Sequence, residues 1–277
     1  MKAWVGTNEG GSLVDARRAA ISILDHGFTV ADGVFETLKV VDGTPFALSR
    51  HLRRLRRSVE AMQLPQPEDA WIRRAVDEVI SGNEAMALGR LRITYSAGIA
   101  PLGSDRGDAS ATLAVAMASA VPWPMTTTAI TVPWARNERS PIAGVKSTSY
   151  AENVIALRQA HALGASEALF ANTRGELCEG SGTNVFVVVD GELLTPSLGS
   201  GCLAGITREL VLEWSPGKEG DLPMSVLAQA DEVFLTSSTR DVHPVRVLDG
   251  RDLGEPGPIT TEVAAIFRAR AASDCDP

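Results

Sequence analysis

The amino-acid sequence predicts an α+β fold of two domains, and three observations favour this fold. The chain has 277 residues, which is enough for two domains of ordinary size. The expected strands and helices follow one another in mixed order, without the regular βαβ alternation of a doubly wound sheet. The stretch SAVPWPM carries two prolines between strand-like segments, which is typical of a linker. We therefore expect a small N-terminal α/β domain at 1–118, a linker at 119–125, and a larger, β-rich α+β domain at 126–277.

The expected N-terminal domain contains a β-hairpin followed by helices. Two β-rich runs in FETLKVVDGTPFAL (35–48) surround Asp42 and Gly43, a pair that favours a tight turn. Residues 49–64 place apolar side chains at helical spacing, and Ser49 is the expected N-cap. The other elements expected in this domain are a helix at 66–81 and strands at 89–98 and 111–118.

The expected C-terminal domain is richer in strands. Apolar and β-branched runs predict strands at 128–133, 167–172, 184–196 and 232–238. Helical spacing predicts helices at 150–164, 207–215 and 260–273. In the helix at 150–164 we expect Val154, Leu157 and Leu163 on the apolar face.

Composition and charge narrow the class of partner. The formal net charge of −8 disfavours nucleic acids and anionic membrane surfaces, so a small molecule is expected. The N-terminal residues lack the pattern of a signal peptide, and no apolar run approaches the roughly 20 residues of a membrane span, so a cytoplasmic location is expected. The three cysteines show no C-x-x-C spacing, so we expect reduced thiols and no metal site.

One lysine stands out in the segment GVKSTSY at 144–150. Only four of the 26 basic residues are lysines, and Lys146 is one of them, inside a Gly/Ser/Thr stretch. It precedes a predicted helix, whose N-terminal dipole disfavours a protonated amine. A neutral amine is a reactive one. The alternative is an ordinary solvent-facing loop lysine.

Three further segments carry residues suited to an ionic ligand. GELCEGSGTNVFVVV (175–189) combines Glu179 with small residues before a strand, AGITREL (204–210) exposes amides at a helix start, and TSSTRDV (236–242) adds hydroxyls. Taken singly, each is a common turn. Together with Lys146, they describe a pyridoxal phosphate pocket, with an amine for the imine, a carboxylate for the ring nitrogen, and amides and hydroxyls for the phosphate.

These motifs resemble those of the fold-type IV, or class IV, pyridoxal-phosphate enzymes. This family contains branched-chain and D-amino-acid aminotransferases, (R)-selective amine transaminases and aminodeoxychorismate lyases. The similarity runs from DHGFTVADGVFETLKV (25–40) to STRDVHPV (238–245), and it includes an H-x-x-R-L-x-x-S pattern at His51, Arg54, Leu55 and Ser58. The resemblance implies a two-domain fold and a homodimer whose active site lies near the subunit interface.

The resemblance also implies roles for individual residues. Lys146 would form the internal aldimine with pyridoxal 5′-phosphate and would act as the catalytic base. Tyr150 would lie near the phenolic oxygen of the cofactor, and Glu179 would pair with the pyridine nitrogen. Arg54 would grip the phosphate. The remaining residues implied to bind the cofactor are Ser181, Gly182, Thr183, Asn184, Ile206, Thr207 and Ser238.

The substrate is less narrowly predicted. Alternation in GRLRITYSAG (89–98) puts Arg90 and Arg92 on one face of a strand, where a basic side chain could bind a substrate carboxylate. The expected substrate-binding residues are Phe35, Arg92, Arg106, Thr239 and Arg240. We expect a transaminase that acts on amino acids and 2-oxo acids, with D-amino acids or (R)-amines somewhat favoured. The alternatives are an aminodeoxychorismate lyase that makes 4-aminobenzoate and pyruvate, a branched-chain L-amino-acid aminotransferase, and a non-catalytic protein that binds pyridoxal phosphate.

Overall fold

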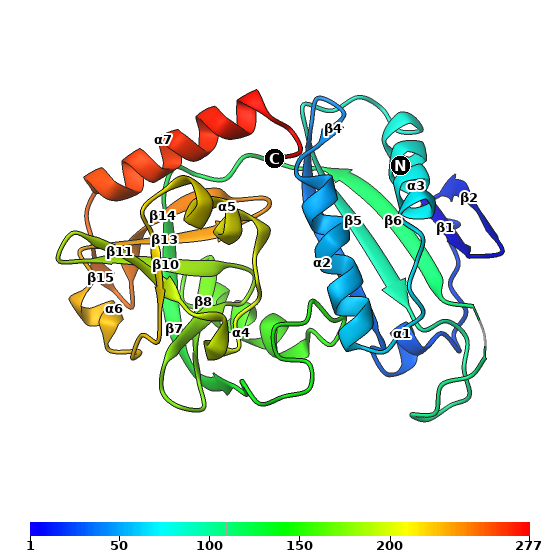
Figure 1. The fold of residues 1–277 in the computed structure, drawn as a ribbon, viewed down its shortest axis with the longest axis horizontal. Coiled ribbons are helices and arrows are strands. Elements are labelled where there is room, and N and C mark those ends of the chain that lie inside the picture. The colour runs from blue at the N-terminus through cyan, green and yellow to red at the C-terminus, as the bar shows by residue number, and fades with distance from the viewer. Residues whose placement is uncertain (109) are drawn as a thin grey trace. The chain divides into compact units, whose positions relative to one another are not determined.

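The computed structural model describes residues 1–108 and 110–277, and this part of the chain forms two compact units (Figure 1). One unit consists of Met1–Pro122, Val145–Ser149 and Cys275–Pro277. The other consists of Trp123–Gly144 and Tyr150–Asp274. Two short segments from the C-terminal part of the sequence therefore belong to the N-terminal unit, and one of them carries Lys146.

The N-terminal unit is built on a six-stranded antiparallel sheet. Its strand order is β2-β1-β6-β5-β3-β4. The hairpin and the two later strands predicted from the sequence are confirmed, whereas the first two strands were not predicted. The strands are β1 (Lys2–Thr7), β2 (Gly10–Asp15), β3 (Gly33–Val41), β4 (Thr44–Pro45), β5 (Leu88–Ser96) and β6 (Thr112–Ser119).

Two helices cover one face of this sheet. The short helix α1 (His26–Thr29) precedes β3, and the longer helices α2 (Leu48–Ala61) and α3 (Asp69–Ser81) pack on the sheet. Alternate strand residues such as Leu38, Ile93 and Val115 join the apolar faces of α2 and α3 in one buried core. Their neighbours in β3 and β5, which include Phe35 and Arg92, therefore point to the other face of the sheet.

The prediction that Ser49 is the N-cap of α2 is wrong. The cap position is Ala47, which has a left-handed backbone conformation (φ 55°) and no side-chain capping hydrogen bond. Ser49 lies inside the first turn, where its backbone N–H and its hydroxyl both donate to the Asp276 carboxylate, at 2.8 and 2.5 Å. A residue 227 positions away thus supplies the acceptor that a local cap usually provides.

The C-terminal unit contains a nine-stranded mixed sheet. Eight strands follow the order β12-β11-β10-β13-β14-β7-β8-β9, and β15 pairs with β14. The four predicted strand regions are confirmed, and the long one at 184–196 is a hairpin of two strands. The strands are β7 (Thr127–Arg136), β8 (Glu167–Asn172), β9 (Leu177–Gly180), β10 (Asn184–Val189), β11 (Glu192–Pro196), β12 (Lys218–Gly220), β13 (Glu232–Ser237), β14 (Asp241–Leu248) and β15 (Arg251–Asp252).

The three predicted helices of this unit are present, but the predicted face of one is wrong. The helices are α4 (Ala151–Ala162), α5 (Ile206–Trp214), α6 (Val226–Gln229) and α7 (Pro258–Ser273), with a 3-10 turn at Leu198–Ser200. In α4 the buried residues are Asn153, Ala156 and Ala160, whereas Val154 and Leu163 are 61% and 66% exposed. Small side chains allow this helix to lie close to the sheet, so its larger apolar residues face outward.

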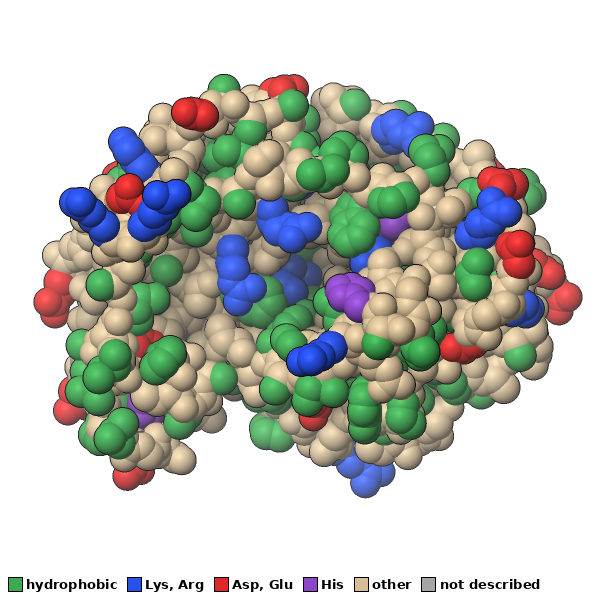
Figure 2. All heavy atoms as spheres, turned by 180° about the vertical axis from the view of Figure 1, so that it is seen from behind, with side chains coloured by type: hydrophobic (Ala, Val, Ile, Leu, Met, Phe, Trp, Pro, Cys, Tyr) green, Lys and Arg blue, Asp and Glu red, His purple; other side chains and the backbone are tan. Residues whose placement is uncertain are grey.

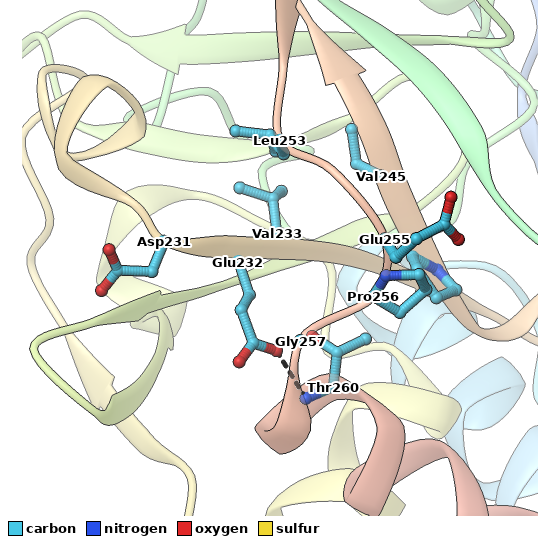
Figure 3. A pocket seen from close by; sticks show the side chains of 10 residues that line it. Asp231, Glu232, Val233, Val245, Leu253, Glu255, Pro256, Gly257 and Thr260 are labelled. Carbon is cyan, nitrogen blue, oxygen red and sulfur yellow. Dashed lines mark hydrogen bonds between the residues drawn. The ribbon is translucent and has the colours of Figure 1, made fainter.

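Helix α7 begins at a pocket lined by acidic and apolar side chains (Figure 3). Glu232 on β13 points toward the start of this helix and accepts hydrogen bonds from the backbone N–H groups of Ile259 and Thr260, at 3.2 and 2.7 Å. A side chain on Gly257 would collide with the Glu232 carboxylate, only 2.2 Å from the position of its Cβ. The acidic group in this pocket is therefore a remote helix cap.

The surface is mixed in charge. The face drawn in Figure 2 shows acidic and basic side chains together, so the net charge of −8 does not form a uniform acidic surface there. Within the residues that the structure describes, no helix is long and apolar enough to cross a membrane.

Candidate active site

The backbone around Lys146 is attached to the sheet of the N-terminal unit. The Phe35 N–H donates to the Lys146 carbonyl at 2.9 Å, and the Thr148 N–H donates to the Gly33 carbonyl at 2.8 Å. The Lys146 N–H in turn donates to the hydroxyl of Ser58 on α2, at 3.4 Å. The segment therefore lies along β3 like an added edge of the sheet, and its position is set by β3 and α2.

The ring of Phe35 contacts two cationic side chains. The Lys146 amine lies 4.4 Å from the ring centroid, and the guanidinium carbon of Arg92 lies 3.8 Å from the same centroid. Because both distances are measured to the same ring, the Lys146 amine and the Arg92 guanidinium carbon are no farther apart than these two distances added together. The structure thus brings the predicted residues Lys146, Phe35 and Arg92 together on the face of the sheet that α2 and α3 do not cover.

A fully buried carboxylate lies on the opposite face of β3. Glu36 accepts hydrogen bonds from Nε and Nη2 of Arg54, at 2.8 and 2.6 Å, and lies 2.7 Å from Nδ1 of His51. Burial by itself would raise the pKa of Glu36, but the charge and hydrogen bond of Arg54, together with His51, lower it to about 2. Burial lowers the pKa of His51, against the opposing effect of Glu36. The predicted phosphate arginine is therefore oriented by an ionised acid.

Arg106 is held by a different acidic residue. Its Nε and Nη2 each lie 2.6 Å from an oxygen of Asp32, and its Nη1 donates to the Gln63 carbonyl at 3.0 Å. The hydrogen bond with Asp32 raises the pKa of Arg106. This arginine fastens the loop that carries it, and the structure does not place it with Phe35 or Lys146.

In the C-terminal unit, Glu179 is bound to the backbone of a neighbouring loop. Its Oε2 accepts a hydrogen bond from the Leu203 N–H at 2.9 Å. Its Oε1 lies 3.8 Å from Nε of Arg136, whose guanidinium stacks on the ring of Phe170 at 4.1 Å. An adjacent cation and a backbone donor both favour an ionised carboxylate. Such a carboxylate can keep a ring nitrogen protonated.

The same loop leads into α5, whose N-cap residue is a glycine and so has no side chain to cap the first turn. Gly205 is the N-cap residue and Ile206 begins the helix, so the amides of the first turn are available for an anion. Asn184 on β10 donates to the Leu203 carbonyl at 2.8 Å. Thr236 is paired with Asn184 across the strands, and its buried hydroxyl has no hydrogen-bond partner among the described residues. The predicted phosphate-binding residues Ile206 and Thr207 therefore lie near unused donors.

The turn at 180–183 is fixed through Ser181. The buried Glu167 carboxylate accepts from the Ser181 N–H at 2.9 Å and from the Ser181 hydroxyl. The Ser181 carbonyl accepts from the Tyr150 hydroxyl at 3.1 Å and from the Asn153 amide at 2.6 Å. The loop residues predicted to bind the cofactor are thus ordered by a buried acid and by α4, and Ser181 itself is almost fully buried.

Arg240 is engaged within the C-terminal unit. Its guanidinium stacks on Trp123 at 3.7 Å and donates to the Ser166 hydroxyl and carbonyl, at 3.0 and 2.8 Å. It also lies 3.2 Å from Nδ1 of His243. The neighbouring residues Ser238 and Thr239 are half-buried where β13 turns into β14. These contacts give Arg240 a structural task, namely holding Trp123 against the sheet.

Sequence reasoning missed three residues that order the site. Glu36, Arg136 and Glu167 are each in contact with a predicted residue: Arg54, Glu179 and Ser181, respectively. Glu36 and Glu167 occupy inward-facing strand positions, where a charged residue usually has a partner. That pattern was visible in the sequence, but it does not identify the partner.

The cysteines do not form a metal site in the described residues. Cys178 and Cys202 are buried, and Cys275 is exposed. Burial raises the pKa of both buried thiols, to about 11 for Cys202, so they are protonated at neutral pH. No group of three or more His, Cys, Asp or Glu that could hold a metal ion occurs within 1–108 and 110–277.

Comparison with known proteins relates this chain to one family of enzymes. The family model for amino-transferase class IV matches residues 33–248. The chain is 34% identical over 269 residues to a bifunctional aminodeoxychorismate lyase / D-amino acid transaminase of Mycobacterium tuberculosis, covering 88% of this chain and 90% of that protein. It is 30% identical over 271 residues to a putative branched-chain-amino-acid aminotransferase of Methanocaldococcus jannaschii, covering 93% of each.

A solved structure extends the similarity to the fold. A hypothetical aminotransferase from Mycobacterium tuberculosis, in its α-ketoglutarate- and PMP-bound form, superimposes with a TM-score of 0.86 at 30% identity, covering 98% of this chain and 99% of that one. The family match and the fold thus define a pyridoxal-phosphate enzyme of fold type IV. The chain belongs to the class IV aminotransferase family.

The residues fit the cofactor of this family, pyridoxal 5′-phosphate. Lys146 supplies an amine on a fixed backbone, and Glu179 supplies a carboxylate beside Arg136. The first turn of α5, which follows a glycine N-cap, and the Thr236 hydroxyl, which has no hydrogen-bond partner among the described residues, supply donors suited to a phosphate. The N-terminal unit thus offers an amine, and the C-terminal unit offers a carboxylate and donors for an anion, which are the kinds of group that the cofactor requires.

Proposed function

We propose that this protein is a transaminase that moves an amino group between an amino acid and a 2-oxo acid, with D-amino acids or (R)-amines as favoured donors. The observation that carries the proposal is the position of Arg92. Its guanidinium shares the Phe35 ring with the Lys146 amine, at 3.8 and 4.4 Å from the ring centroid. A guanidinium so near the reactive amine can hold a substrate carboxylate.

The cofactor roles are those that the resemblance to the class IV enzymes implies. Lys146 would attach the cofactor, Glu179 would pair with its ring nitrogen, and Tyr150 would serve its phenolic oxygen. The residues that hold the phosphate are Arg54, Ile206, Thr207 and Ser238. When bound, the cofactor supplies an electron-withdrawing ring that stabilises the negative charge developing at the reacting carbon.

The proton transfers belong to Lys146. Its amine would remove the proton from the α-carbon of the donor and would later deliver a proton to the cofactor carbon that takes up the amino group. The hydrogen bonds to β3 and to Ser58 hold its backbone still, so the reaction requires movement only of its side chain. Glu179 supports the same step by keeping the ring nitrogen protonated.

The test compares donors with and without a carboxylate in two arginine variants. Arg92→Leu should raise the KM for D-alanine and D-glutamate about tenfold to a hundredfold, because a charged hydrogen bond is lost, and should change the KM for an (R)-amine little. Arg90→Leu is the control, since Arg90 lies on the same strand face, two residues away. An equal rise in KM for donors with and without a carboxylate would contradict the role of Arg92. An equal rise in Arg92→Leu and Arg90→Leu would contradict it as well.

A lyase is the second candidate, and the names of relatives favour it. The Mycobacterium tuberculosis protein at 34% identity is named both as an aminodeoxychorismate lyase and as a D-amino acid transaminase. Incubation with aminodeoxychorismate distinguishes the activities, because a lyase releases 4-aminobenzoate and pyruvate without needing an acceptor oxo acid. L-Leucine as the best donor would instead support the branched-chain activity. If no donor changes the cofactor spectrum, the protein is non-catalytic.

We also propose that two copies of the chain form a homodimer. Two loops of the N-terminal unit are joined by backbone hydrogen bonds from His26 to Gly98 and from Ala100 to Leu24. They expose Phe28 and Leu102, which are 75% and 78% exposed, and several other apolar side chains. An apolar patch of this kind is typical of a protein contact. Light scattering should give twice the chain mass, and Phe28→Asp should shift the equilibrium toward monomer.

A further inference from the structure

The backbone of Leu203 is held on both sides by residues from two different strands. Its N–H donates to Oε2 of Glu179 on β9 at 2.9 Å, and its carbonyl accepts from the Asn184 side-chain amide on β10 at 2.8 Å. The Gly205 N–H donates to the same carbonyl at 2.8 Å. The Leu203 backbone is therefore a fixed point between a carboxylate and an amide, and we call this arrangement the Leu203 clamp.

Gly205 is required by the clamp for a steric reason. Its φ of −68° is open to any residue, so backbone freedom does not explain the glycine. A Cβ at this position would lie 1.9 Å from Oδ1 of Asn184. The amide of Asn184 thus occupies the space that a side chain at 205 would need. Any larger residue there would push the amide away from the Leu203 carbonyl.

The clamp sets the start of α5. Helix α5 begins at Ile206, one residue after Gly205, and Gly205 has no side chain that could cap its first turn. Asn184 is 5% exposed and is paired with Thr236 on the neighbouring strand, so it is anchored in the sheet. A shift of the Leu203 carbonyl would therefore move the first-turn amides relative to the sheet.

We propose that Asn184 is a positioning residue that acts on the phosphate through Leu203 and α5, and that the Leu203 clamp links phosphate binding to the orientation of Glu179. This inference rests on the proposed function, because it assumes that α5 receives the cofactor phosphate. The sequence predicts that Asn184 binds the cofactor directly, whereas in this proposal Asn184 acts on the cofactor through the Leu203 backbone. The Leu203 backbone then aligns both the Glu179 carboxylate for the ring nitrogen and the first-turn amides of α5 for the phosphate.

The test measures equilibrium binding of pyridoxal 5′-phosphate and of unphosphorylated pyridoxal to the apo-protein. Asn184→Leu removes the amide while keeping similar bulk, and it leaves the Leu203 carbonyl with one donor fewer. The affinity for pyridoxal 5′-phosphate should fall about tenfold, since losing a buried hydrogen bond costs about 1–2 kcal/mol. The affinity for pyridoxal should fall by a much smaller factor, because pyridoxal has no phosphate for α5 to bind.

Gly205→Ala provides an independent route to the same contact. The new methyl group displaces the Asn184 amide, so this variant should reproduce the loss, and the double variant should lose little more than either single variant. Gly220→Ala is the matched control, because its Cβ would approach only Leu222, at 3.4 Å. If Asn184→Leu does not fold, Asn184→Asp replaces it, since aspartate has the same shape but cannot donate to the carbonyl.

The outcomes separate the inference from the function on which it rests. Additive losses, equal losses for both ligands, or unchanged affinity in the variants would overturn the role of the clamp. If the unaltered protein binds pyridoxal 5′-phosphate no better than pyridoxal, the proposed function itself fails. If it binds the phosphorylated form better and the variants do so equally well, only the inference fails.

Discussion

The buried carboxylate of Glu36 makes the stability of the N-terminal unit depend on pH. Its folded-state pKa of about 2 lies below the value of 4.5 for an ordinary glutamate. The stabilisation is therefore fully present above pH 4.5 and is lost as the pH falls toward 2. A difference of about 2.5 pKa units corresponds to roughly 3 kcal/mol. The lowered pKa of His51 changes the free energy of unfolding in the same direction. Below pH 6.5 the unfolded chain takes up a proton at His51 that the folded chain does not take up, so stability falls as the pH falls.

The perturbation that tests this linkage is Glu36→Gln. It keeps the shape of the side chain but leaves Arg54 buried without its counter-charge, which costs about 3–5 kcal/mol at pH 7. The free energy of unfolding is measured with urea between pH 7 and pH 3, for the unaltered protein and for the variant. The difference in the free energy of unfolding between the unaltered protein and Glu36→Gln should become smaller as the pH falls. A difference below about 1 kcal/mol at pH 7, or one that does not change with pH, would contradict the stabilising role of the ionised Glu36 carboxylate.

Three other predictions concern contacts that lie within one of the two units of the chain. Glu232→Ala should lower the free energy of unfolding by about 1 kcal/mol and speed amide exchange in the first turn of α7, because it removes the remote cap; unchanged exchange would contradict this. Asp276→Ala should loosen the first turn of α2 by a similar amount, with the exposed Asp105→Ala as control, and equal exchange in both variants would count against the cap. His51→Asn should flatten the pH dependence of stability between pH 7 and 5.5, whereas the same change at the exposed His161 should leave it as it is.

Local sequence patterns were sufficient for most of the elements. The Asp42-Gly43 turn, the helical spacing in 49–64 and the apolar run at 184–196 each predicted what the structure shows. The strands of the first 15 residues were missed, because Gly10 and Gly11 interrupt their pattern and pairing with β6 is a distant contact. The buried face of α4 was missed because small residues, which carry a weak hydrophobic signal, form it.

The sequence predicts reactive residues for the proposed site, but it does not predict the residues that contact them in the structure. Lys146 and Glu179 are predictions from composition and from motifs. Glu36 and Glu167 could not be matched to their partners, because a pair that is distant in sequence leaves no local pattern. The role of Ser49 was misread for the same reason, since its acceptor lies at Asp276.

Lys146 is the proposed attachment point of the cofactor, and the scarcity of lysine makes this role directly testable. The lysine side chains that could compete with it are Lys2, Lys39 and Lys218. The protein is loaded with pyridoxal 5′-phosphate, reduced with borohydride, digested and analysed by mass spectrometry. The phosphopyridoxyl group should be found on the Lys146 peptide alone, and Lys146→Ala should abolish it. Labelling of another lysine instead, or a label that persists in Lys146→Ala, would contradict the account.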